Sequence, residues 1–149
     1  MPQGRLDLTW APATLLADKP SKTQRGGHPA SNETVSDDIE QLLKSARHEV
    51  LIFSPYFVPG PRGMALFETL RRRGVTVHVL TNSLAATDAP AVHIGYARYR
   101  TALLEAGVEL HELRPQLGSP RSSVGDFGSS RASLHAKALV IATWCWSAR

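Results

Sequence analysis

The chain has 149 residues, of which 42% are hydrophobic, and a formal net charge of +4. This length suits one domain with a buried core, and the apolar content excludes an intrinsically disordered chain. A lone cysteine, Cys145, excludes an internal disulfide and a cysteine-based zinc site. Apolar runs stay well short of the roughly 20 residues that span a membrane, and residues 1–10 lack the apolar core of a signal peptide.

The chain order of the predicted elements indicates an α/β domain. Residues 1–32, rich in proline, glycine, lysine and serine, are predicted to be a linker or the end of a preceding half, with a short strand over 6–10. Ser31 and Asn32 then precede apolar residues at helical spacing from Val35 to Ala46, which predicts a capped helix. Further helices are predicted over 63–73 and 91–106, and strands over 49–54, 75–80, 108–113 and 134–141. The order α-β-α-β-α-β-loop-β favours a mostly parallel sheet flanked by helices.

Loops follow the predicted strands at the edge where parallel sheets bind ligands. Residues 55–61 must form a loop because they are rich in proline, and residues 115–132 form a long glycine- and serine-rich loop. Tyr56 can touch a substrate at this edge or pack against the prolines. Asn82 and Ser83 can bind phosphate there or cap a turn.

A histidine and a lysine near the end of the chain suggest chemistry on a phosphodiester. His135 and Lys137 are two residues apart and lead into an apolar run, so a strand over 134–141 would place both on one face. The histidine can attack or protonate, and the lysine supplies a fixed positive charge. Without further context, such a pair arises most often by chance.

The context of this pair resembles the phospholipase D superfamily. Residues 133–137 are similar to the start of its HxKxxxxD motif. Segments 50–59, 73–77 and 99–108 resemble, in the same order, the elements that precede this motif in cardiolipin synthase-like and phospholipase D-like proteins. The resemblance covers 33–141 and implies a phospholipase D-like half-domain, the C-terminal half of a larger protein.

The resemblance implies phosphohistidine chemistry without a metal or a cofactor. In the family, one histidine attacks phosphorus, a second protonates the leaving alcohol and then activates an acceptor, and the lysines hold phosphate oxygens. His135 and Lys137 are therefore the predicted catalytic residues, with His135 as acid and base. Tyr56, Asn82 and Ser133 are the predicted substrate-binding residues. The implied partners are a phospholipid or other phosphodiester at a membrane surface, and a second phospholipase D half.

Two departures from the family pattern predict that the chain is inactive alone. Ala142 occupies the position of the family's aspartate, which is expected to orient the histidine or neighbouring groups, and no second HxK pair is present. The tail over 142–149 does not resemble the family's continuation, and we expect an aberrant, truncated or frameshifted end. One alternative is a homodimeric single-motif phosphodiesterase or nuclease, the only reading with nucleic acid as a partner. Another is a non-catalytic remnant that binds phosphate or membranes.

The other histidines are predicted to play no part in catalysis. His78 lies inside an apolar strand and is predicted to be a core histidine. No metal site is predicted from the remaining ones, which are His28, His48, His93 and His111.

Overall fold

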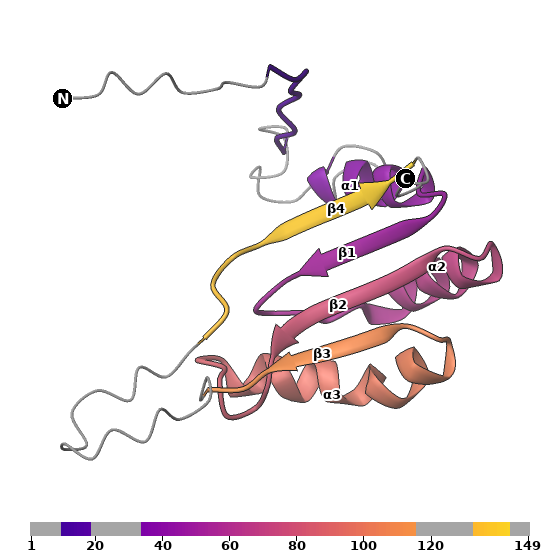
Figure 1. The fold of residues 1–149 in the computed structure, drawn as a ribbon. Coiled ribbons are helices and arrows are strands. Elements are labelled where there is room, and N and C mark those ends of the chain that lie inside the picture. Colours follow the sequence, from indigo (N-terminus) through magenta and orange to yellow (C-terminus); the bar gives the residue numbers. More distant parts are fainter. Residues whose placement is uncertain (1–9, 19–33, 116–132, 144–149) are drawn as a thin grey trace, which may run out of the picture. The chain divides into compact units, whose positions relative to one another are not determined.

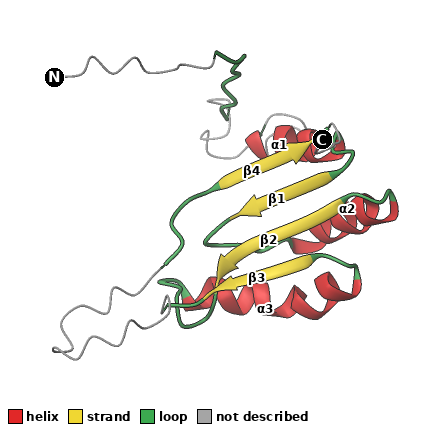
Figure 2. Ribbon diagram, viewed as in Figure 1, coloured by secondary structure: helices red, strands yellow, loops and turns green. Residues whose placement is uncertain are grey.

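Helices and strands alternate along the chain in the computed structural model, which describes residues 10–18, 34–115 and 133–143 (Figures 1 and 2). The elements are α1 (Val35–Lys44), β1 (Glu49–Phe53), α2 (Gly60–Arg72), β2 (Thr76–Asn82), α3 (Pro90–Glu105), β3 (Glu109–Leu113) and β4 (Ala138–Ala142). The predicted α/β class is thus confirmed. The predicted strand over 6–10 lies almost wholly outside the described residues, as do most of the predicted 115–132 loop and the end of the tail.

The chain splits into two compact units, one over residues 1–39 and the other over 40–149. In the first, residues 10–18 form neither helix nor strand, and Thr34 caps α1. The Thr34 hydroxyl accepts a hydrogen bond from the backbone N–H of Asp37 at 3.3 Å. Ser31 and Asn32, the predicted cap, lie outside the described residues.

The second unit contains a four-stranded sheet in the order β3-β2-β1-β4. β1 pairs in parallel with β2, and β2 in parallel with β3. β4 is antiparallel to β1, with Phe53 opposite Ala138. Because β4 runs backwards, the residues that precede it lie at the carboxyl ends of β1 and β2.

The core lies on one face of this sheet. Alternate residues of a strand point to the same face, so Val77 and Val79 share one face of β2 with their neighbour Val50 on β1. All three are fully buried. Side chains from the helices and connections cover them: Leu43, Ala46, Phe57, Met64, Phe67, Leu70, Tyr96 and Leu103. Figure 1 shows α2 and α3 on this same face. Within the described residues, no helix covers the opposite face.

Glycines end two of the helices, as the sequence predicts. Gly74 and Gly107 have φ angles of +79° and +81°, a left-handed conformation that glycine adopts without steric cost. The start of α2 corrects the sequence prediction, because this helix begins at Gly60 rather than 63. Pro61 falls in its first turn, where a missing N–H costs no helical hydrogen bond. No helix of the described ranges is long and apolar enough to cross a membrane.

Candidate active site

The predicted site residues come together at the carboxyl edge of the sheet. Tyr56 follows β1, Asn82 ends β2, and the 133–137 segment leads into β4. Hydrogen bonds and a ring contact join these three parts of the chain, as described below. The edge therefore brings Tyr56 next to Lys137, which comes 81 positions later in the sequence.

The segment with His135 and Lys137 is not part of a strand, which corrects the prediction of a strand over 134–141. β4 begins only at Ala138, opposite the last residue of β1. Beyond that point the ladder with β4 lacks a donor, because Ser54 faces β2, where its N–H donates to the carbonyl of Leu80, and the next residue on the β4 side is Pro55, which has no N–H. Residues 133–137 form neither helix nor strand.

Asn82 holds this segment in place. Its side chain is 1% exposed, and its Oδ1 accepts a hydrogen bond from the N–H of Leu134 at 2.8 Å. Its Nδ2 donates to the carbonyl of Leu134 at 3.1 Å and approaches the hydroxyl of Ser133 at 3.3 Å. The amide of Asn82 is thus engaged with the backbone of the residue before His135. Within this structure, its contacts are those of an anchor for the motif.

Lys137 lies over the ring of Tyr56. The Lys137 Nζ is 5.6 Å from the ring centroid, within the range of a cation–π contact. The Tyr56 hydroxyl donates to the carboxylate oxygens of Asp88 at 2.8 and 2.9 Å. The hydrogen bond to Asp88 raises the pKa of Tyr56, because the carboxylate stabilises the protonated phenol.

Asp88 is a member of this edge that the sequence analysis missed. It lies in the loop between β2 and α3 and is exposed. The signal for it was present, since a carboxylate in a loop after a buried strand falls at the carboxyl edge of a parallel sheet. The contact with Tyr56 spans 32 residues, however, and only the fold makes the two meet.

His135 is exposed, as are Ser133 and Lys137. Within the described ranges, no hydrogen bond or ion pair engages the His135 imidazole. On this exposed residue, a phosphodiester could reach the imidazole without displacing a partner from the described part of the chain. A neutral imidazole with a free nitrogen can attack or accept a proton, and a charged one can donate.

Ala142 lies at the opposite end of β4 from this edge. It pairs with Glu49, the first residue of β1, and its carbonyl accepts N–H groups of Arg47 and His48. It lies four positions after Ala138 along the strand, or about 13 Å away at roughly 3.3 Å per residue. A carboxylate at position 142 would not reach His135, so direct orientation of His135 is not what the alanine removes.

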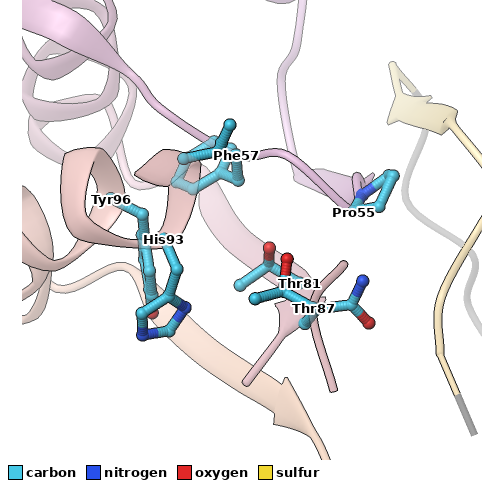
Figure 3. Close-up of a pocket in the computed structure, with 8 residues that line it drawn as sticks. Pro55, Phe57, Thr81, Thr87, His93 and Tyr96 are labelled. Atoms are coloured by element: carbon cyan, nitrogen blue, oxygen red, sulfur yellow. The ribbon is translucent and has the colours of Figure 1, made fainter. Parts of the chain in front are cut away.

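A small crevice lies beside the edge on the helix-covered side of the sheet. Figure 3 shows Pro55 and Phe57 from the loop after β1, together with His93 and Tyr96 from α3. It leaves no room for a water-sized molecule, whereas ligand pockets usually enclose roughly 300–1,000 Å³. We therefore place the candidate site on the exposed surface around His135 rather than in this crevice.

The fold and the edge together define a half-domain of the phospholipase D class, with three parallel strands, an antiparallel fourth and an HxK pair ahead of it. Residues 39–147 match the family described as "Cardiolipin synthase, PLD-like domain". The chain belongs to this family, and the resemblance stated from the sequence is confirmed.

Relatives of the chain include synthases and a protein without an assigned role. The chain is 41% identical to cardiolipin synthase C of Escherichia coli K12 over 140 residues, which are 93% of this chain and 29% of that protein. It is 35% identical to an uncharacterized protein of Helicobacter pylori 26695 over 128 residues, 86% of this chain and 24% of that one. It is 34% identical to cardiolipin synthase B of E. coli K12 over 87 residues, 56% of this chain and 21% of the synthase. The chain thus spans less than a third of these relatives.

Proposed function

We propose that this chain supplies one half of a phospholipase D-type site, which transfers or hydrolyses a phosphatidyl group of a phospholipid. His135 is the acid and base, and Lys137 holds the phosphate oxygens. The observation that carries the proposal is the pair of hydrogen bonds between the Asn82 side chain and the backbone of Leu134, which fixes the HxK segment at the carboxyl edge. There His135 is exposed and Lys137 lies over Tyr56.

The proposed reaction has two displacements at phosphorus. A histidine of the other half attacks phosphorus, and the bond to the leaving alcohol breaks while His135 gives that alcohol its proton. An acceptor alcohol, or water, then attacks the phosphohistidine, and His135 takes the acceptor's proton as the N–P bond breaks. The charge of Lys137 stabilises the oxygens that gain charge in each transition state.

A second half is required by this scheme, because His135 fills only one of the two histidine roles. The chain contains one HxK pair and matches less than a third of the length of cardiolipin synthase C. The second histidine comes from another segment of a longer protein or from a partner half. We propose that the chain by itself has no turnover.

A chimera tests the proposal. The segment of E. coli cardiolipin synthase C that this chain matches is replaced by the chain, and cardiolipin formation from phosphatidylglycerol vesicles is measured. We expect an active chimera, with a loss of about 10³-fold or more in His135→Ala and about 10²-fold or more in Lys137→Ala. His48→Ala is the matched control, because His48 is exposed and outside the edge.

Each result of this experiment decides the matter. An inactive but folded chimera, or one that keeps its activity in His135→Ala, contradicts the proposal. The isolated chain is assayed in parallel with bis(p-nitrophenyl) phosphate. Hydrolysis whose rate rises with the square of the chain concentration, and which is lost in His135→Ala, would favour a homodimeric phosphodiesterase instead.

A further inference from the structure

The uncovered face of the sheet carries a cluster of metal-ligating side chains away from the HxK segment. Glu109 and His111 are two residues apart on β3, so they share a face. His78 on β2 is the register partner of Glu109 and lies on that same face. The cluster therefore combines two imidazoles and one carboxylate on neighbouring strands.

The three side chains are close enough to share one ion. One nitrogen or oxygen from each residue lies within 4.8 Å of those from the others. The Nδ1 atom of His78 is 3.2 Å from the Oε2 atom of Glu109. The rings of His78 and His111 lie nearly parallel, with an interplanar angle of 20° and centroids 6.2 Å apart.

Glu49 approaches the other nitrogen of His78. Its Oε1 atom is 3.4 Å from Nε2, so a ring proton on Nε2 would donate toward Glu49. That tautomer leaves the Nδ1 lone pair beside Oε2 of Glu109, where a shared cation would bind both atoms. A carboxylate behind a ligating histidine is the usual means of fixing its tautomer at metal sites.

Apolar side chains lie beside the two histidines of the cluster. Leu51, Phe53 and Leu80 line a hollow of about 400 Å³ together with His78 and His111. An apolar lining lowers the local dielectric and so strengthens the attraction between a cation and its ligands. The hollow lies on β1, β2 and β3, whereas the HxK segment lies past the carboxyl ends of β1 and β2, where Asn82 holds it.

We propose that His78, Glu109 and His111 bind a divalent transition-metal ion, for which Zn²⁺ is the best fit. Two imidazoles and a carboxylate suit Zn²⁺, whereas Mg²⁺ and Ca²⁺ prefer sites made only of oxygen ligands. Three protein ligands leave a fourth position for water or another ligand. The sequence analysis predicted no metal site, because β2 and β3 meet only in the fold. It predicted a core role for His78, whose side chain is 26% exposed on the uncovered face.

Calorimetric titration of the 149-residue chain with Zn²⁺ at neutral pH tests this site. We expect one ion per chain, affinity at least about 100-fold weaker in His111→Ala, and about 10- to 100-fold weaker in Glu49→Gln. His48→Ala is the control, and it should bind as the unmodified chain does. His111 is exposed, so its replacement leaves the core intact, which circular dichroism checks.

Co²⁺ provides a second readout that does not depend on affinity. Bound at this site, it should show the visible absorption of a four-coordinate ion, and His78→Ala should abolish it. The absence of stoichiometric binding overturns the proposal, as does binding that survives both histidine substitutions.

Discussion

Replacing Asn82 by alanine should release the HxK segment while leaving the sheet folded. The substitution removes the acceptor of the Leu134 N–H at 2.8 Å and the donor to its carbonyl at 3.1 Å. Each such bond contributes about 1 kcal/mol net, so the two together hold the segment by about 2 kcal/mol. The longer contact to the exposed hydroxyl of Ser133 adds little. A difference of about 2 kcal/mol corresponds to a roughly 30-fold change in an opening equilibrium.

Hydrogen exchange of the Leu134 amide measures this release directly. We expect its exchange to accelerate about 30-fold in Asn82→Ala, whereas the amide of Val79 in the middle of β2 keeps its protection. Ser83→Ala is the matched control, because the neighbouring Ser83 hydroxyl is buried without a hydrogen-bond partner among the described residues. Equal exchange at Leu134 in Asn82→Ala and in the unmodified chain would refute the anchoring role of Asn82.

Two further predictions concern the stability of the fold. Gly74→Ala should lower the free energy of unfolding, measured by urea denaturation, by about 1 kcal/mol. Gly107→Ala should lower it by about 1 kcal/mol more than Gly74→Ala does. Both glycines have positive φ, which strains an alanine. Only at Gly107 would the new Cβ also crowd a neighbour, because it would lie 3.1 Å from Nε of Arg71. Equal losses of stability in the two variants would contradict this added cost at Gly107. Burial first and the Glu112 carboxylate second raise the pKa of Tyr96 from 10 to about 12. The unfolded chain therefore loses this proton first, so stability should fall as pH rises from 10 to about 12, and Tyr96→Phe should flatten that fall, as denaturation curves at several pH values would show.

Local patterns in the sequence predicted the helices and strands well, because they depend on neighbouring residues. Side-chain periodicity separates buried runs such as 75–80 from amphipathic ones such as 35–44. Gly74 and Gly107 end their helices as predicted, since left-handed φ angles favour a residue without a Cβ. The HxK pair and its neighbouring segments also identified the family, which the match over 39–147 confirms.

The boundaries at the candidate site depended on partners distant in the sequence. The apolar run over 134–141 predicted one strand, but β4 begins at Ala138, because the next residue after Phe53 that faces β4 is Pro55, which has no N–H to donate. Local sequence could not decide whether Asn82 binds phosphate or caps a turn, since its hydrogen bonds reach a residue 52 positions away.

The sequence by itself therefore determined the alternation of helices and strands, the mostly parallel character of the sheet, and the HxK pair. All three follow from residue patterns over short stretches of the chain. Only the tertiary structure decided the antiparallel direction of β4, the anchoring of its leading segment by Asn82, and the meeting of Tyr56 with Lys137. It also decided that β2 and β3 bring two histidines and a glutamate within reach of one ion. The physical reason is that register and strand direction follow from which backbone groups and faces remain free once the rest of the chain has packed.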